Sequence, residues 1–171
     1  MAESLTVNKN LSDEEIYKSL IPQIDNLISE NDEIISSLSN FTAALKESFD
    51  KISWVGFYFL KNDKLILGPF QGKVACTEIR LGNGVCGTAA AKKETIIVED
   101  VNKFPGHIAC DADSKSEIVI PLKDKDEVYG VLDLDSYNYS AFNEVDKIYL
   151  EKLCELLFNK IDFKKIKNIT T

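Results

Sequence analysis

The spacing of apolar residues divides the chain into a helical first part and a strand-rich second part. Over residues 11–50, apolar positions recur every three or four residues, which predicts helices. Ser12 followed by Glu15 has the pattern of a capping box and places the first helix start at the next residue. Pro22 is expected to kink or split that helix, and Asn31 is the predicted N-cap of a second one.

From residue 52 onward the apolar period changes to two, which predicts strands. The predicted strands are Ser53–Lys61, Lys64–Leu67, Cys76–Leu81, Thr95–Val98, Ser116–Leu122 and Val128–Asp135. A glycine-rich loop over Gly82–Gly87 precedes a short helix over Thr88–Lys92, and a last helix starts at Asn143. This order predicts one α+β domain over residues 12–168, with helices on one face of a central antiparallel sheet, after a flexible N-terminus over residues 1–11.

Composition and charge narrow the class of function. The 171 residues carry a net charge of −8, and Arg80 is the single arginine. A nucleic-acid binder needs a basic, arginine-rich face, and an anionic membrane surface attracts basic segments, so neither partner is expected. The sequence has no apolar run of the roughly 18 residues that a membrane span needs, and its polar start does not resemble a secretory signal. We therefore expect a cytoplasmic protein, with entry into the nucleus by diffusion left open.

In a reducing compartment, cysteines serve catalysis, redox chemistry or metal binding more often than structural disulfides. Cys110 lies in a loop with Gly106 and His107, where a substrate could reach it, although a small buried filler is the alternative. Nearby Asp111 and Glu117 would oppose its thiolate, so backbone N–H groups or His107 would have to offset them. The other cysteines are Cys76 on a predicted strand, Cys86 in the glycine-rich loop, and Cys154 on an apolar helix stripe that predicts a core position.

Zinc binding is the weaker reading of these cysteines. Their spacings do not match short zinc knuckles, and only a half-site of His107 and Cys110 remains as an alternative. The interpretation therefore favours redox chemistry, with no metal and no bound cofactor.

Three carboxylates form the second candidate feature. Asp133 and Asp135 project from one face of a strand about 7 Å apart, and Glu117 lies near the start of the neighbouring strand. If that face is buried, the cluster either binds a cation or ammonium group or keeps one member protonated as a general acid. An exposed sheet face, with Glu117 as a solvated strand-end charge, is the alternative.

An aromatic pair and a glycine-rich turn complete the candidate site. Trp54 and Tyr58 share one strand face with Gly56 between them, which suits either the floor of a pocket or plain core packing. The Gly82–Gly87 loop lacks the lysine of a phosphate-binding loop, but the free N–H groups of the helix after it suit a small anion such as a carboxylate.

Taken together, six segments resemble the free methionine-(R)-sulfoxide reductases, which are stand-alone GAF-domain enzymes. The segments are Trp54–Tyr58 (WVGFY), Gly68–Lys73 (GPFQGK), Gly84–Ala90 (GVCGTAA), Phe104–Asp111 (FPGHIACD), Ser116–Val119 (SEIV) and Gly130–Ser136 (GVLDLDS). The resemblance covers the chain from about residue 12 to the C-terminus. It implies a GAF-like fold with a loop-enclosed ligand pocket on the sheet face opposite the helices, and reduction of the R epimer of free methionine sulfoxide.

The resemblance also implies roles for individual residues. By position, Cys110 resembles the nucleophile, Cys76 the resolving cysteine and Cys86 an additional redox-active or supporting cysteine. Glu117, Asp133 and Asp135 match acidic pocket residues, and Trp54 and Tyr58 match an aromatic wall. Glu78 and Arg80 depart from the family pattern.

The mechanism expected from these roles has two stages. Cys110 attacks the sulfoxide while a protonated carboxyl donates to its oxygen, and Cys76 then condenses with the resulting sulfenic acid to a disulfide. Thioredoxin regenerates the thiols by exchange, and the resemblance is consistent with a homodimer formed through the terminal helices. The alternative function is a non-catalytic GAF sensor of a small ligand.

Overall fold

The computed structural model describes residues 4–29, 31–108, 110–125 and 127–166. Its strands form one six-stranded antiparallel sheet within these ranges, in the order β3-β2-β1-β6-β5-β4. The strands are β1 (Trp54–Lys61), β2 (Lys64–Gln71), β3 (Glu78–Arg80), β4 (Ile96–Val98), β5 (Ser116–Lys123) and β6 (Val128–Ser136). The α-helices are α1 (Asp13–Leu27), α2 (Ile34–Ser48), α3 (Gly84–Lys92) and α4 (Glu144–Lys160), with short 3₁₀ turns at Val101–Lys103 and Phe163–Lys165.

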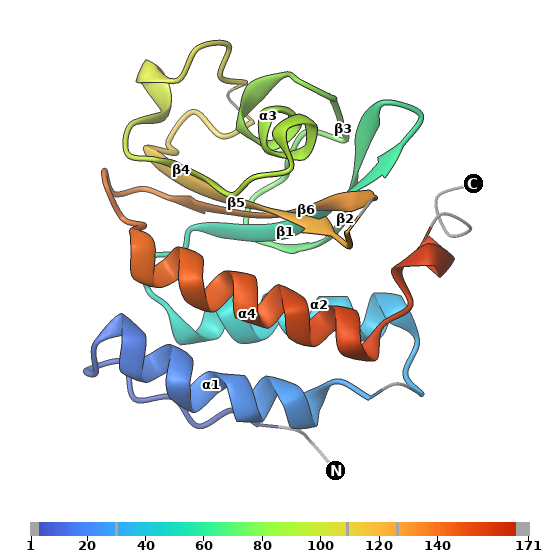
Figure 1. Cartoon of the computed structure of the whole chain (residues 1–171). Coiled ribbons are helices and arrows are strands. Elements are labelled where there is room, and N and C mark those ends of the chain that lie inside the picture. The colour runs from blue at the N-terminus through green and yellow to red at the C-terminus, as the bar shows by residue number, and fades with distance from the viewer. Residues whose placement is uncertain (1–3, 30, 109, 126, 167–171) are drawn as a thin grey trace.

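The sheet separates a helical layer from a layer of loops. Helices α1, α2 and α4 lie on one side of the sheet, whereas α3 and the long loops lie on the other (Figure 1). This arrangement confirms the predicted α+β class and the central antiparallel sheet. It also shows that the loop-covered face carries a helix of its own, α3.

Side chains of the central strand β6 point alternately into the helical layer and into the loop layer. Leu132 and Leu134 are fully buried in the core shared with α1, α2 and α4. Val131 belongs to a second apolar cluster, which packs under α3 and the loops. Because successive residues of a strand point to opposite faces, Asp133 and Asp135 fall on the side of Val131. The fold therefore directs two carboxylates away from the helical core and toward the loop layer.

The helix starts were partly predictable. The Ser12–Glu15 capping box is present at the start of α1, and Asn143 caps α4 in a second capping box with Asp146. The prediction that Asn31 caps the second helix is wrong, because the N-cap is Glu33. The preceding residues form a turn instead, in which the Asp32 backbone N–H donates to the Ser29 carbonyl at 3.1 Å.

Pro22 does not split α1, which runs unbroken from Asp13 to Leu27. Proline removes the hydrogen bond to the carbonyl four residues earlier, here that of Lys18. Pro22 is exposed, so it sits on the solvent side of the helix, where water can bond that carbonyl. The buried stripe of the helix, with Ile16, Leu20 and Ile24, is unaffected.

Two cysteines lie in elements other than those predicted. Strand β3 starts only at Glu78, so Cys76 lies in the connection before it rather than on a strand. Helix α3 already begins at Gly84, so Cys86 is in its first turn rather than in a loop. Gly87 explains the early start, because a Cβ there would lie 2.4 Å from the Arg80 carbonyl oxygen. Only glycine lets the helix approach the end of β3 so closely.

The N-terminal segment is bonded to α1 where it is described: the Thr6 backbone N–H donates to the Gln23 side chain at 2.8 Å. Residues 1–3 and 167–168, which belong to the predicted boundaries, lie outside the described residues. The division into an N-terminal segment over 1–11 and a single domain over 12–168 therefore stays a proposal. In the described part of the chain, no helix combines the length and apolar character required to cross a membrane.

Candidate active site

Strand register gathers the three predicted carboxylates on one patch of the sheet. Glu117 on β5 lies directly opposite Asp135 on β6, and Asp133 lies one alternation further along the same face. From the other neighbour, β1 places Trp54 opposite Asp135 and Gly56 opposite Asp133. Residues directly opposite in neighbouring strands have Cβ atoms about 5 Å apart, so the acidic and aromatic residues share one surface. The strand register thus brings the predicted acidic residues and the predicted aromatic residues onto one face of the sheet.

This patch is buried, which changes the protonation of its acids. Glu117 and Asp133 are each only 6% exposed. Burial, together with the nearby carboxylates, raises the pKa of Glu117 well above its ordinary value, and burial and Asp135 do the same for Asp133. Burial raises the pKa of Asp135 to about 6, although a 2.7 Å hydrogen bond from the Ser114 hydroxyl counteracts part of the rise. The cluster therefore holds protons near neutral pH, as a general acid must.

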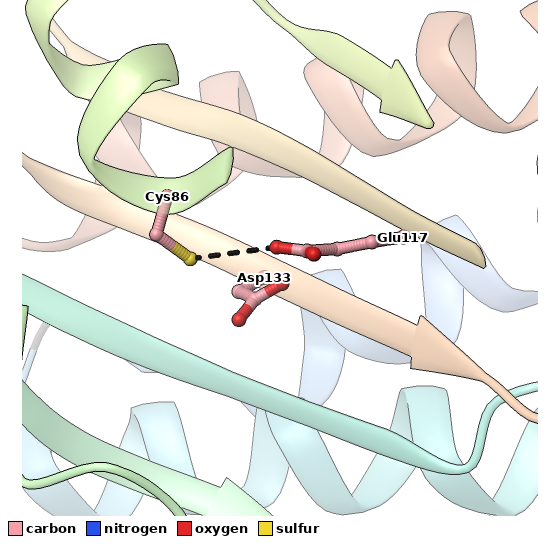
Figure 2. A group of neighbouring side chains, drawn as sticks. All are labelled: Cys86, Glu117 and Asp133. Carbon is pink, nitrogen blue, oxygen red and sulfur yellow. Dashed lines mark hydrogen bonds between the residues drawn. The ribbon is translucent and has the colours of Figure 1, made fainter. Parts of the chain in front are cut away.

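Cys86, on α3, adds a thiol to this acidic cluster. Its thiol points from α3 toward the sheet and donates to Glu117 Oε1 over 3.8 Å, and Asp133 lies beside both (Figure 2). Burial and the charges of Asp133 and Glu117 raise the pKa of this thiol well above its ordinary value. A buried thiol among carboxylates is a poor nucleophile, since the thiolate is the reactive form. Cys86 is therefore suited to donating a hydrogen bond, not to attacking a substrate.

One acid oxygen in this cluster has no partner. Asp133 Oδ1 is buried and accepts no hydrogen bond from any described residue. Potential ligand atoms of Cys86, Glu117 and Asp133 all lie within 4.8 Å of one another, so the group could hold a small cation. It could equally receive an ammonium or a protonated oxygen of a substrate, because either would satisfy the free oxygen. The alternative zinc site built on His107 and Cys110 does not fit this structure, because the Cys110 sulfur is bonded to Cys76.

The disulfide joins the two loops that flank the patch. Cys76 precedes β3 and Cys110 precedes β5, and their Cα atoms are 5.5 Å apart. The thiols of Cys86 and Cys154 are free and buried, and Cys154 belongs to the helical core as its stripe predicted. The pairing thus matches the two cysteines that the family resemblance assigned to nucleophile and resolver.

The aromatic wall supports the loop that carries Cys76. The Trp54 indole N–H donates to the Lys73 carbonyl at 3.1 Å, and the Tyr58 hydroxyl donates to the Cys76 carbonyl at 3.0 Å. Glycine at position 56 leaves room for the Trp54 indole, because a Cβ at Gly56 would lie 2.4 Å from that ring. The indole packs against Phe70, with ring centroids 5.5 Å apart. Both aromatic residues therefore combine a packing role with hydrogen bonds that hold the loop carrying Cys76.

A cavity lies between the acidic patch, α3 and the disulfide. The cavity is small, with about 40 Å³ of space for the centres of water-sized molecules, and it opens to solvent. All but one of the predicted site residues line it: Trp54, Tyr58, Cys86, Cys110, Glu117, Asp133 and Asp135. The exception is Cys76, which is bonded to Cys110 from outside the lining. The cavity is thus a small chamber with acids on its floor and a disulfide sulfur in its wall.

Comparison with known proteins identifies this arrangement. The family model "GAF domain" matches residues 36–161. A curated Saccharomyces cerevisiae protein named free methionine-R-sulfoxide reductase is 44% identical over 95% of this chain and 95% of its own length. The chain belongs to the free methionine-R-sulfoxide reductase family. A free methionine-R-sulfoxide reductase from Neisseria meningitidis, solved in complex with its substrate, superposes with a TM-score of 0.86 at 39% identity over 99% of this chain and 100% of its own. The Dictyostelium discoideum GAF domain-containing protein A is 51% identical over 93% of this chain and 100% of its own.

The structure of this free methionine-R-sulfoxide reductase family member adds residues that sequence reasoning missed. Ser114 bonds Asp135, and Lys73 pairs with Asp113 at 2.8 Å and Asp111 at 3.3 Å. The only sequence signal for Lys73 was its place at the end of the GPFQGK segment. Ser114 gave no signal, because its contact joins residues 21 positions apart.

His107 was weighed in the sequence as a group that offsets negative charge near Cys110. It lines the cavity of this family member beside Ile108, and burial lowers its pKa. A neutral imidazole carries no charge to stabilise a thiolate, although it can accept or donate a proton.

Proposed function

We propose that this chain reduces free methionine-(R)-sulfoxide to methionine, with Cys110 as nucleophile and Cys76 as resolving cysteine. The observation that carries the proposal is the Cys76–Cys110 disulfide in the wall of a chamber whose floor holds buried, proton-bearing acids. A sulfoxide needs a sulfur nucleophile and an acid at the same place, because its oxygen leaves only when protonated. The membership of the family, with 44% identity to the yeast reductase, supports the same substrate.

The acid step uses the protons that burial retains. In the free enzyme, Glu117 and Asp133 resist ionisation because water is excluded from them. When the sulfoxide oxygen enters the cluster, a carboxyl group donates its proton to that oxygen and becomes an anion. Cys86 can stabilise this anion, since its thiol already donates to Glu117. Glu117 is therefore the favoured proton donor.

The reaction moves one oxygen atom and two electrons between the sulfoxide and the thiols of Cys110 and Cys76. The Cys110 thiolate attacks the sulfoxide sulfur, oxygen passes to Cys110 as a sulfenic acid, and methionine is released. The Cys76 thiol then attacks the Cys110 sulfur, and the oxygen leaves as water. The substrate gains two electrons and the cysteine pair loses them. The disulfide present in the structure is the product of this second step.

Charges at both ends of a free amino acid explain the expected selectivity. Asp135, with a pKa of about 6, is ionised near neutral pH and can bind the substrate ammonium. The start of α3 lines the cavity at Gly84 and Val85 and offers backbone N–H groups to the substrate carboxylate. A methionine sulfoxide within a peptide lacks both charges, and its chain would have to enter the chamber. We therefore expect peptide-linked sulfoxide to be excluded.

A dithiol must return the electrons, and we propose thioredoxin for this role. Such a cycle requires a reducing compartment, which agrees with the cytoplasmic location predicted from the sequence. A homodimer through the terminal helices also stays a prediction, which analytical ultracentrifugation tests directly.

The proposal is tested by turnover of the pure epimers. Protein, thioredoxin, thioredoxin reductase and NADPH are mixed with free methionine-(R)-sulfoxide, its S epimer, or a blocked peptide containing the R sulfoxide. We expect turnover of the free R epimer alone. Cys110→Ser should abolish it, whereas Cys154→Ser, a change of a buried free cysteine outside the cavity, should keep it. Turnover by the Cys110→Ser protein would refute the nucleophile, and binding of substrate without any turnover by the native protein would favour the sensor function.

A further inference from the structure

Hydrophobic side chains are exposed on both cysteine loops. Val74, two residues before Cys76, is 88% exposed, the highest value of any large hydrophobic residue in the described chain. Ile108, two residues before Cys110, is 38% exposed and borders the cavity mouth together with Val74. Tyr137 is 37% exposed, and Lys73, the neighbour of Val74, lies over its ring at 5.0 Å. Val74, Ile108 and Tyr137 are called the docking surface below.

The backbone beside Val74 is available to a partner. The carbonyls of Lys73 and Cys76 are bonded by Trp54 and Tyr58. Between them, Val74 and Ala75 make no backbone hydrogen bond to any other described residue. An exposed, unpaired stretch of backbone next to an apolar side chain is the arrangement that extended peptide segments recognise by main-chain hydrogen bonds. Main-chain hydrogen bonds to this segment would therefore both strengthen the binding of a partner peptide segment and set its orientation.

The two sulfurs of the disulfide face different surroundings. Cys110 is part of the cavity wall, but Cys76 is not. Cys76 is half-buried, and the exposed residues Val74 and Thr77 lie on either side of it along the chain. A protein that reduces the bond from outside would meet Cys76 first. Release of the Cys110 thiolate toward the cavity would then leave it in position for the next sulfoxide.

We propose that the docking surface receives the protein dithiol that regenerates the enzyme, and that this dithiol attacks the Cys76 sulfur. The inference rests on the proposed function, because a regenerating partner is needed only if the disulfide forms in each cycle. One partner thiolate bonds to Cys76, the Cys76–Cys110 bond breaks, and Cys110 leaves as a thiolate. The second partner thiol then attacks the mixed disulfide, which frees Cys76 and oxidises the partner.

Charge around the surface favours a protein with an apolar rim over a small charged thiol. The Lys73 ammonium is paired with Asp111 and Asp113, so the surface presents no unpaired cation for an anionic thiol such as glutathione. A protein dithiol whose reactive thiol is surrounded by apolar residues would instead cover Val74 and gain the free energy of its burial.

The main experiment compares Val74→Asp with Ile35→Asp. Ile35 is an equally branched, 41% exposed residue on α2, on the opposite side of the sheet, and is a matched control. Turnover of free methionine-(R)-sulfoxide is measured with varied thioredoxin and, separately, with dithiothreitol as the reductant. We expect kcat/KM for thioredoxin to fall at least about tenfold in Val74→Asp, since a lost valine contact plus a buried charge exceeds 1.4 kcal/mol. Because Val74 also lines the cavity, the effect is measured as a ratio: turnover with thioredoxin should fall about tenfold relative to turnover with dithiothreitol, whereas Ile35→Asp should leave this ratio within about twofold.

Each outcome has a definite meaning. Unchanged kcat/KM for thioredoxin in Val74→Asp refutes the docking surface. An equal loss with dithiothreitol also refutes it, because Val74 would then act in the chemistry itself. Absence of turnover by the native protein with dithiothreitol would instead contradict the proposed function. Conversion of a native dimer to a monomer by Val74→Asp, seen by analytical ultracentrifugation, would assign the surface to a second copy of the chain and overturn the inference.

The site of attack has its own test. A thioredoxin whose second thiol is replaced by serine traps the mixed disulfide with the oxidised protein, and peptide mass spectrometry locates it. We expect the bond at Cys76, and a bond at Cys110 would overturn the proposed direction of attack.

Discussion

Replacement of Asp135 by asparagine should make the folded protein more stable while it weakens substrate binding. Asp135 lies on the central strand β6, opposite Glu117 on one side and Trp54 on the other. Asparagine has almost the same shape and keeps an oxygen that can accept the 2.7 Å hydrogen bond from Ser114. The substitution therefore removes the charge of the side chain with little change in packing.

The size of the effect follows from the pKa of Asp135. Burial raises this pKa from 3.8 to about 6. At 1.36 kcal/mol per unit, the ionised side chain destabilises the folded state by about 3 kcal/mol. Because the pKa is raised in the folded state, the ionised side chain lowers the free energy of unfolding only where it is charged. Below about pH 4 Asp135 is largely protonated in both the folded and the unfolded state, so this destabilisation is absent there. The penalty grows between pH 4 and 6 and is complete above about pH 6. Loss of the Asp135 charge also relieves Glu117 and Asp133, whose pKa values it raises.

Urea unfolding of both oxidised proteins at several pH values between 4 and 8 measures this penalty. The free energy of unfolding of Asp135→Asn should match that of the native protein within about 0.5 kcal/mol at pH 4 and exceed it by about 3 kcal/mol at pH 7.5. Asp50→Asn, a change of an aspartate whose side chain is 79% exposed, should alter stability by less than about 1 kcal/mol throughout. A stability difference that does not change with pH would show that packing, not charge, causes it. A less stable Asp135→Asn protein at pH 7.5 would refute the reasoning outright.

Two further predictions concern residues around the disulfide. Lys73→Met removes the ion pairs to Asp111 and Asp113 that join the two cysteine loops. The disulfide should then be about fivefold easier to reduce in a glutathione titration. The control Lys64→Met breaks an exposed pair with Glu78 and should leave the midpoint of that titration unchanged. An unchanged midpoint in Lys73→Met would contradict this role. Cys86→Ser should retain turnover within about fivefold, because serine can still donate to Glu117. Peptide mapping after one oxidising turnover should still find only the Cys76–Cys110 bond, and a loss of turnover below one hundredth would make Cys86 a redox partner.

The features that could be predicted from sequence are those set by local pattern. In β6, the alternation of Leu132 and Leu134 with Asp133 and Asp135 fixed which side chains share a face, and the structure confirms this division. The Ser12–Glu15 capping box depends on residues three positions apart, and it was also correct. Such features are local, so a single sequence contains all the information that they need.

The features that were missed depend on contacts between distant segments. Helix α3 begins at Gly84 because Gly87 packs against the Arg80 carbonyl, an approach that the sequence alone does not reveal. Cys76 lies before the start of β3, and its carbonyl accepts a hydrogen bond from Tyr58, 18 positions away. Cys86, predicted in a loop, instead lies in the first turn of α3, where it is buried against Glu117.

The sheet both stabilises the fold and holds the buried acids, and each of these two roles belongs to one face of the sheet. The helical face buries Leu132 and Leu134 of β6 and supplies stability, whereas the other face buries Glu117 and Asp133 without a cation among the described residues that could neutralise them. Such acids destabilise the free protein, but they create a site that a positively charged group stabilises. The ammonium of a free amino acid provides that charge, and a residue inside a peptide does not. We therefore propose that the buried acids divide two roles: Glu117, which stays protonated, supplies the proton for the sulfoxide oxygen, and Asp135, which is ionised near neutral pH, attracts the ammonium of a free amino acid.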